Sequence, residues 1–349
     1  MNINDYSEHI SGIIYDTRNN YEVEALFYLT QHCNLCCKGC YMRSSPKSSR
    51  DVLPYADLDF FLNEFGKTPN FTNSVTFSGG EIFTTPINYL TACSHMVLDR
   101  GWGLQLKTNG AWVMDKQKRG AVVNMLRQLQ PSRGLLATSD EIKVFLATKP
   151  KWLLRLLGRD FVRWWMFKRL PTASALSLAV SVDDVLHPAQ SADWFIKIVN
   201  MVAGDKKLRD KLDLKTFTLE YAIPLLELEV LNNPDLKIKN FQQIPGRRAA
   251  KYSVNGVKVE SYIGEFVDVA AVPAVKKLSE IAVPPLGDAR GRLVYCFYPD
   301  GTVGFDCNYL ESVGRVPYRD AAGKCKAWPQ IQEDIHKKLV AEYKKARVK

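Results

Sequence analysis

Hydrophobic residues recur along the first 250 residues in two alternating patterns. Short apolar runs are typical of buried strands, and apolar residues at helical spacing are typical of helices. The apolar runs predict strands at 24–30, 74–77, 104–107, 175–182, 215–223 and 238–244. The helical spacing predicts helices at 55–65, 86–99 and 115–128. Because strands and helices alternate, we expect an α/β fold of βα units around a parallel sheet.

The pattern changes in the last third of the chain. Residues 257–269 alternate loosely, as in an antiparallel pair of strands, and residues 293–306 have the pattern of a hairpin with a Pro-Asp-Gly turn. Residues 331–349 have the pattern of a basic amphipathic helix. We therefore expect one domain of βα units over 1–250 and a small α+β extension over 251–349.

Residues 131–174 form an insertion that the repeating βα pattern does not need. Within it, residues 149–170 carry seven basic residues and one acidic residue, with basic side chains four apart on one stripe of a helix. Like charges at this spacing destabilise an isolated helix by about 0.2–0.5 kcal/mol per pair, so the stripe should have an anionic neighbour. Three interpretations are open: a solvated helix packed on the sheet, a site for an acidic peptide or nucleic acid, and a helix at a membrane surface. We favour docking of a negatively charged peptide.

The overall composition is that of a globular chain. Hydrophobic residues make up 46% and charged residues 24% of the 349 residues, which is enough to build a large core. No long uncharged apolar run occurs, and the first ten residues lack the basic and then apolar pattern of a signal peptide. We therefore predict a cytoplasmic protein. The net charge of +10 indicates an anionic partner.

Cysteines are the strongest candidates for chemistry. Cys33, Cys37 and Cys40 follow the first strand with C-x3-C-x2-C spacing. Thiolates select zinc, copper(I) or iron–sulfur clusters, and a [4Fe–4S] cluster usually takes four of them, so three cysteines would leave one iron open. A structural zinc site is the alternative, because with Cys36 the stretch forms two C-x2-C pairs whose four thiolates could bind zinc. Cys93 stands apart from the other cysteines, and we assign it no role.

The cysteine stretch resembles the signature of the radical S-adenosylmethionine (SAM) superfamily, in which an aromatic residue follows the last cysteine, here Tyr41. Three later stretches match in the order that the superfamily uses them, each after a predicted strand. They are Ser78-Gly79-Gly80-Glu81, Lys107-Thr108-Asn109-Gly110 and Ser181-Val182-Asp183. The resemblance covers roughly two thirds of the chain and implies a partial (β/α)6 barrel of the TIM type.

The resemblance also implies roles for individual residues. Cys33, Cys37 and Cys40 would hold a [4Fe–4S] cluster whose open iron binds SAM. Further SAM contacts fall on Tyr41, Gly79, Gly80, Glu81, Thr108, Asn109, Ser181, Asp183, Gly246 and Arg247. An electron from a donor such as flavodoxin or ferredoxin would cleave SAM, and the resulting 5′-deoxyadenosyl radical would take a hydrogen atom from the substrate. Gly246 and Arg247 also fit an ordinary basic turn.

The last third of the chain resembles the SPASM and Twitch extensions of that superfamily, in which a hairpin carries ligands of an auxiliary [4Fe–4S] cluster. Cys296 and Cys307 flank the predicted hairpin turn, and Cys325 follows in a loop. The spacing departs from that of the extensions, and a full SPASM set has seven cysteines where this region has three. Three interpretations stay open: an auxiliary cluster, a cysteine that donates a hydrogen atom to the substrate, and structural cysteines.

The resemblance to these extensions implies that the substrate is a ribosomally made peptide, which the enzyme would crosslink, epimerise or oxidise. Radical SAM modification of a small molecule or RNA is a second hypothesis. A zinc-stabilised nucleic-acid-binding protein is a third, from a different class, and it predicts bound zinc and no affinity for SAM. We favour a peptide partner over contact with a membrane or with nucleic acid.

Overall fold

The computed structural model describes residues 22–37, 40, 42–68, 71–130, 176–182, 191–219, 237–243, 249–264, 292–305 and 313–347. The central strands are β1 (Glu22–Thr30), β2 (Phe71–Gly79), β3 (Gly103–Thr108), β4 (Leu176–Ser181) and β5 (Leu212–Leu219). The flanking strands are β6 (Ile238–Gln243), β7 (Ala249–Val254), β8 (Val257–Gly264), β9 (Arg292–Phe297), β10 (Thr302–Phe305) and β11 (Val313–Pro317). The α-helices are α2 (Tyr55–Lys67), α3 (Ile87–Leu98), α4 (Lys116–Gln128), α8 (Ser191–Gly204), α9 (Lys206–Arg209) and α11 (Trp328–Arg347). Two 3-10 helices are η1 (Ile82–Thr84) and η2 (Ala111–Met114).

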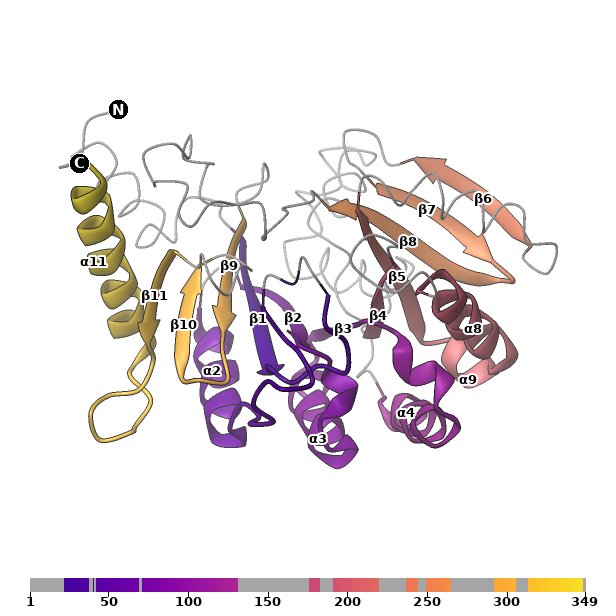
Figure 1. The fold of residues 1–349 in the computed structure, drawn as a ribbon, viewed down its shortest axis with the longest axis horizontal. Coiled ribbons are helices and arrows are strands. Elements are labelled where there is room, and N and C mark those ends of the chain that lie inside the picture. The colour runs from indigo at the N-terminus through magenta and orange to yellow at the C-terminus, as the bar shows by residue number, and fades with distance from the viewer. Residues whose placement is uncertain are drawn as a thin grey trace, which may run out of the picture.

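All these strands belong to one 11-stranded sheet, in the order β11-β10-β9-β1-β2-β3-β4-β5-β8-β7-β6. The strands from β9 through β1 to β5 and on to β8 pair in parallel. Antiparallel pairs extend both ends, with β10 and β11 beyond β9 and with β7 and β6 beyond β8. Figure 1 shows the strongly twisted sheet with α2, α3, α4 and α8 along one side. This arrangement confirms the α/β class and is that of a partial (β/α) barrel.

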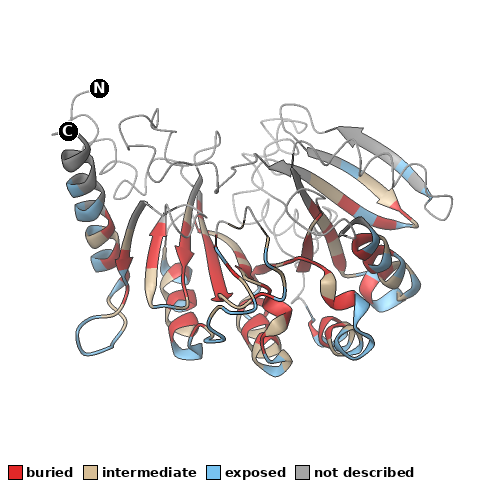
Figure 2. Ribbon diagram, viewed as in Figure 1, coloured by how far each residue is buried: buried red, intermediate tan, exposed pale blue. Residues whose placement is uncertain are grey.

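Alternation along the strands divides the side chains between two faces of the sheet. On β1, Val23, Ala25, Phe27 and Leu29 join the large core between the sheet and the helices. Leu26 and Tyr28 point to the other face, where they pack with Met42, Cys296 and Tyr298 in a smaller cluster. Figure 2 shows how burial concentrates in the central strands and on the helix sides that face them. We call the two sides the helix face and the inner face of the sheet.

The last strand of the parallel sheet is not the one expected from the sequence. Residues 238–243 form β6 at the edge, paired antiparallel with β7, whereas β8 pairs in parallel with β5. The strand predicted at 238–244 is present as β6, but its expected place in the parallel sheet was wrong, because an apolar run identifies a strand without fixing its neighbours. The hairpin of β7 and β8 turns at Asn255 and Gly256, whose φ angles of 51° and 81° suit this Asn-Gly pair. This dipeptide is the sequence signal that could have located the hairpin.

The structure also bears on the expected division into 1–250 and 251–349. The boundary falls inside β7, and β9 from the last third of the chain pairs with β1 from the first. Phe27 and Phe297 stack across this pair with ring centroids 4.7 Å apart. The described parts of both segments therefore share one sheet and one core.

Two other expectations about the last third hold, whereas the strand pair expected at 257–269 does not, because residues 257–264 form the single strand β8. The hairpin is present as β9 and β10, with Gly301 of its turn at a φ angle of 84°. The terminal helix is α11, which begins at Trp328, ahead of the expected start at 331. The basic insertion at 131–174 lies outside the described residues. No helix in the described part of the chain is long and apolar enough to cross a membrane.

Candidate active site

The cysteine loop leaves the carboxyl end of β1, where a parallel sheet commonly binds ligands. The loop folds back on itself, since the Cys33 amide donates to the carbonyl of Ser45 at 3.2 Å and the Cys40 amide donates to the carbonyl of Cys37 at 3.2 Å. Cys33 is buried, Cys37 and Cys40 are half-buried, and Cys36 is exposed. The thiol that the C-x3-C-x2-C spacing leaves out is therefore the one that faces solvent.

Backbone amides point at two of the three sulfurs. The Leu35 amide lies 3.4 Å from Cys33 Sγ, and the Ser44 amide lies 3.4 Å from Cys40 Sγ. Arg43 makes the second contact possible, because its left-handed φ of 49° turns the chain so that the next amide faces the sulfur. Such N–H donors stabilise negative charge on sulfur, and they tune thiolates that ligate iron–sulfur clusters.

Gly79 and Gly80 hold the cysteine loop against the end of β2. The Gly80 amide donates to the carbonyl of Thr30 at 2.8 Å, and the Glu81 amide donates to the carbonyl of His32 at 2.9 Å. A Cβ atom on Gly79 would lie 2.3 Å from the Thr30 oxygen, and one on Gly80 would lie 2.2 Å from the His32 oxygen. Both positions therefore need glycine, because the backbone of the loop occupies the space of a side chain.

Replacing Gly80 by alanine should destabilise the protein and displace the cysteine loop. The added methyl group would meet backbone atoms that cannot move independently, so we expect a loss of about 1–3 kcal/mol in the free energy of unfolding. Gly120 is the matched control, because it lies in α4 with open space around its Cβ position. Gly120→Ala should leave stability unchanged or raise it by about 0.5–1 kcal/mol. Denaturant unfolding of both variants measures the difference, and equal effects would contradict this role for Gly80.

The Glu81 carboxylate joins the end of β2 to the end of β3. It is buried, with 2% of the residue exposed, and accepts hydrogen bonds from the Phe83 amide at 3.1 Å and the Thr108 hydroxyl at 2.8 Å. It also accepts one from the Asn109 amide at 2.7 Å. Hydrogen bonds to a charged acceptor are the strongest of the ordinary kinds. Glu81 thus fixes the turn that follows β3.

Asn109 connects that turn to the cysteine loop. Its side-chain Nδ2 donates to Asn34 Oδ1 at 2.9 Å and lies 3.7 Å from Cys33 Sγ. Its Oδ1 accepts from the Ala111 amide at 2.9 Å, which orients the amide group. Motif residues from three separate strand ends are therefore joined by one chain of hydrogen bonds. The sequence analysis did not single out Asn34, and no local pattern marks it.

Burial controls the protonation of Cys33. It raises the pKa of this thiol to about 12, and the negative charges of Glu81, Cys37 and Cys40 act in the same direction, while the Leu35 amide opposes them. The thiol is therefore neutral near pH 7 until a cation replaces its proton. Metal binding at this position must release a proton.

The residues present fit an iron–sulfur cluster in donor chemistry. Three soft ligands lie in one loop, and amides already face two of the sulfurs. The hydroxyl of Ser44 is buried and has no hydrogen-bond partner within the described residues, so a bound group beside Cys40 would satisfy it. The sulfurs are not gathered, since no three Cys, His, Asp or Glu side chains in the described ranges are placed to hold a metal ion. The cluster at Cys33, Cys37 and Cys40 stays a prediction.

The remaining expected SAM contacts are only partly described. Ser181 ends β4, half-buried, opposite Phe217 of β5. Four further residues with expected SAM contacts lie outside the described residues: Tyr41, Asp183, Gly246 and Arg247. Cys307, which lies between Cys296 and Cys325 in the sequence, is also outside them. Thr108 is buried and also accepts hydrogen bonds from the Gly110 amide and the Trp112 indole at 3.1 and 3.2 Å. The Thr108 hydroxyl therefore stabilises the turn after β3, whether or not it also contacts a ligand.

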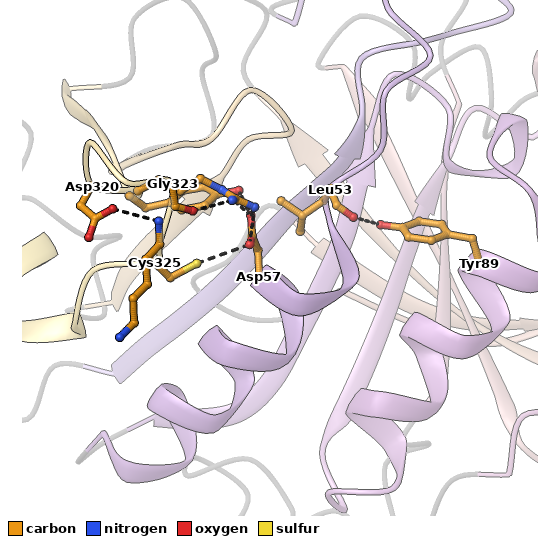
Figure 3. Close-up of polar contacts among 9 residues, drawn as sticks. Leu53, Asp57, Tyr89, Asp320, Gly323 and Cys325 are labelled. Atoms are coloured by element: carbon orange, nitrogen blue, oxygen red, sulfur yellow. Dashed lines mark hydrogen bonds and ion pairs between the residues drawn. The ribbon is translucent and has the colours of Figure 1, made fainter.

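Cys296 and Cys325 lie on opposite faces of the sheet. Cys296 packs on the inner face with Leu26 and Tyr28, in the cluster against which Cys40 also packs. Cys325 lies on the helix face, where its thiol approaches Asp57 of α2 at 3.4 Å (Figure 3). Two cysteines separated by the sheet cannot bind one cluster. Among the described residues, the structure therefore does not bring Cys296 and Cys325 to one site, and an auxiliary cluster that includes Cys307 stays a prediction.

Asp57 is the centre of a buried polar cluster on the helix face, part of which Figure 3 shows. Its carboxylate accepts two bonds of 2.6 Å from Arg319 Nη2, one from the Tyr318 hydroxyl at 2.9 Å and one from Cys325. Burial raises the pKa of Cys325 to about 11, and the charge of Asp57 adds to the effect. Arg319 also donates to the carbonyl of Gly323 at 2.7 Å. The cluster fastens the segment after β11 to α2, a role that the sequence analysis missed.

Comparisons with known proteins are limited to solved structures, since neither protein-family models nor curated proteins match. Streptococcus suis SuiB bound to S-adenosylmethionine is 13% identical, with a TM-score of 0.35, over 81% of this chain and 60% of that chain. Streptococcus suis SuiB bound to precursor peptide SuiA is 12% identical, with a TM-score of 0.39, over 85% of this chain and 62% of that chain. Methylornithine synthase (PylB) is 11% identical, with a TM-score of 0.34, over 75% of this chain and 59% of that chain. The chain thus spans about three fifths of the length of these structures, and values this low assign neither a family nor an activity to it.

Proposed function

We propose that this chain is a radical SAM enzyme. One observation carries the proposal: the cysteine loop, the Gly79-Gly80-Glu81 turn and the Thr108-Asn109 turn meet at adjacent strand ends and are joined by hydrogen bonds. These stretches are the ones that resemble the superfamily in sequence. A structural zinc loop is identified by its cysteines alone, whereas this resemblance also includes the turns after β2 and β3. The observation therefore favours the enzyme over the zinc-stabilised binding protein.

In this proposal the protein holds and orients its cofactors. Cys33, Cys37 and Cys40 would ligate the [4Fe–4S] cluster, which together with SAM supplies the radical chemistry. Asn109 orients the loop through Asn34 and faces Cys33 Sγ. Glu81 keeps the turn after β3 in place through two backbone amides and a hydroxyl. Loop and turns would thus hold the cluster and SAM in a fixed relation.

We propose a peptide as the substrate and a small redox protein such as flavodoxin or ferredoxin as the electron donor. The net charge of +10 supports an acidic peptide. We include no auxiliary cluster shared by Cys296 and Cys325, because the sheet separates them. Crosslinking, epimerisation and oxidation are equally compatible with the site.

Reductive cleavage of SAM tests the proposal without knowledge of the substrate. Anaerobically reconstituted protein, given SAM and dithionite, should form 5′-deoxyadenosine and methionine, measured by liquid chromatography and mass spectrometry. Protein loaded with zinc in place of iron is the control and should form neither product. If iron-loaded protein binds no SAM and forms no 5′-deoxyadenosine, the proposed function is wrong.

A further inference from the structure

Lysines gather on the inner face of the sheet at its β6–β7–β8 end. On β7 and β8, Val254, Val257 and Val259 are buried on the helix face, where α8 packs. Alternation sends Lys251 and Lys258 to the opposite face. The Lys251 side chain is 56% exposed, and Lys258 is also exposed. Figure 1 shows α8 on one side of this end of the sheet.

Strand pairing extends this group in both directions. Lys239 of β6 is exposed and lies opposite Ser253, which in turn lies opposite Lys258. Lys251 lies opposite Glu260, and Glu260 lies opposite Lys215 of β5. Three exposed lysines and the half-buried Lys215 therefore share one face.

The same row of paired residues leads to the candidate active site. Lys215 lies opposite Ala179 of β4, and Ala179 lies opposite Lys107 of β3. Lys107 stands two residues before Asn109, whose side chain contacts the cysteine loop. We call Lys107, Lys215, Lys239, Lys251 and Lys258 the lysine face. It extends from the outer hairpin to the strand end that faces Cys33, with Ala179 of β4 between Lys215 and Lys107.

Fewer carboxylates than lysines lie on this face among the residues that the structure describes. Glu260 lies 3.9 Å from the Lys251 ammonium. Asp213, Glu24 and Glu260 oppose the effect of burial, which lowers the pKa of Lys215. Among the described residues, these three carboxylates lie on the same face as five lysines, three of which are exposed. The three exposed lysines lie at its outer end, where a ligand arriving from solvent would meet them first.

Protection of a sheet edge does not account for this arrangement. Lysines on edge strands prevent pairing with other chains, and Lys239 on β6 fits that role. Lys251, Lys258 and Lys215 lie on β7, β8 and β5, which have strand neighbours on both sides. Protection of an edge strand therefore does not explain the positive charge of these three lysines, which lies on the face of the sheet.

We propose that the lysine face binds an acidic segment of the peptide substrate and leads the modified residue to the cysteine loop. This inference rests on the proposed function and specifies its substrate class. A row of ammonium groups attracts glutamate and aspartate side chains, speeds their association and makes binding depend on salt. The partner is thus a peptide with several carboxylates near the residue that reacts.

The test compares two variants of the full, reconstituted chain with equal loss of charge. The face variant carries Lys239→Gln, Lys251→Gln and Lys258→Gln. The control variant carries the same change at three exposed lysines on the opposite side of the fold: Lys116, Lys118 and Lys206. Probes are fluorescein-labelled peptides of alternating glutamate and serine or of alternating glutamine and serine, with binding followed by fluorescence anisotropy at low and physiological salt.

We expect the unmodified protein to bind the glutamate peptide and to lose affinity as salt rises. The face variant should bind it about tenfold more weakly, because three modest charged contacts are lost. The control variant should stay within about twofold of the unmodified protein, and none of the proteins should bind the glutamine peptide comparably. Equal binding by both variants, or equal loss in both, would overturn the proposal.

A single-stranded RNA with the same net charge as the glutamate peptide tests whether the lysine face binds nucleic acid instead of a peptide. If the RNA binds more tightly than the glutamate peptide, and the face variant loses that binding, the lysine face is a nucleic-acid site and the peptide proposal is wrong. The binding test needs no SAM, so its failure differs from that of the proposed function. Failure of the proposed function appears as absent 5′-deoxyadenosine in the unmodified protein, whatever the peptide does.

Discussion

Replacing Cys33, Cys37 or Cys40 singly by alanine should reduce the formation of 5′-deoxyadenosine from SAM to the level without enzyme. Each change removes one of three thiolates that would hold the [4Fe–4S] cluster, and two remaining ligands do not retain it in a form that binds SAM. The measurement is the rate of 5′-deoxyadenosine formation after anaerobic reconstitution and reduction with dithionite. Iron content and far-ultraviolet circular dichroism on the same samples separate loss of the cluster from loss of the fold.

Cys36 is the matched control for these variants. It lies in the same loop but is exposed, and the C-x3-C-x2-C spacing does not include it. Cys36→Ala should keep both iron and activity near the values of the unmodified protein. If Cys36→Ala abolished metal binding together with the other three variants, four thiolates would share the site, and a structural zinc centre would explain the loop better.

Asp57→Asn should lower the free energy of unfolding by about 2–3 kcal/mol, since breaking a buried ion pair costs about 3–5 kcal/mol and Arg319 is partly solvated. The Asp57 side chain is 3% exposed and that of Arg319 is 36% exposed. The change also leaves the bonds from Tyr318 and Cys325 with a neutral, differently shaped acceptor. Chemical denaturation followed by tryptophan fluorescence measures the effect, and Trp328 at the start of α11 reports on this region.

Asp59 provides the matched control on the same helix. It pairs with Arg100 at 2.7 Å, but its side chain is 48% exposed. Asp59→Asn should therefore cost no more than about 1 kcal/mol, as exposed ion pairs do. Similar losses at both positions would mean that the Asp57 cluster does not fasten the segment after β11 to α2.

The βα units could be predicted because their signals are local. In α2, Leu58, Phe61, Leu62 and Phe65 recur at helical spacing, and all four are buried against the sheet. The apolar runs of β1 and β4 likewise identify strands that are covered on both sides. In each case the apolar residues that form the sequence pattern are the ones that pack in the core, so the pattern predicts the element directly.

The neighbours of each strand could not be predicted in the same way. The sheet order places β8 beside β5 and β9 beside β1, and no feature of these strands states which partner they take. The Asp57 cluster shows the same limit, since Asp57 and Arg319 are 262 residues apart in the chain. Contacts over such distances depend on how the whole sheet closes, which periodicity does not encode.

The turns after β2 and β3 have a structural role that the sequence did not suggest. The resemblance assigns Gly79, Gly80 and Glu81 to cofactor contact, and the structure explains the same residues by contacts within the protein. The glycines admit the backbone of the cysteine loop, and Glu81 holds the turn that carries Asn109. Contact with SAM remains a prediction for them.

Metal content tests the central claim most directly. Iron, acid-labile sulfide and zinc should be measured per chain on anaerobically reconstituted protein, beside a variant with Cys33, Cys37 and Cys40 all replaced by alanine. We expect about four irons and four sulfides in the unmodified protein and none in the variant. A second variant, Cys296→Ala with Cys325→Ala, should keep the full iron content, because the sheet separates these two cysteines. Stoichiometric zinc without iron in the unmodified protein would contradict the account.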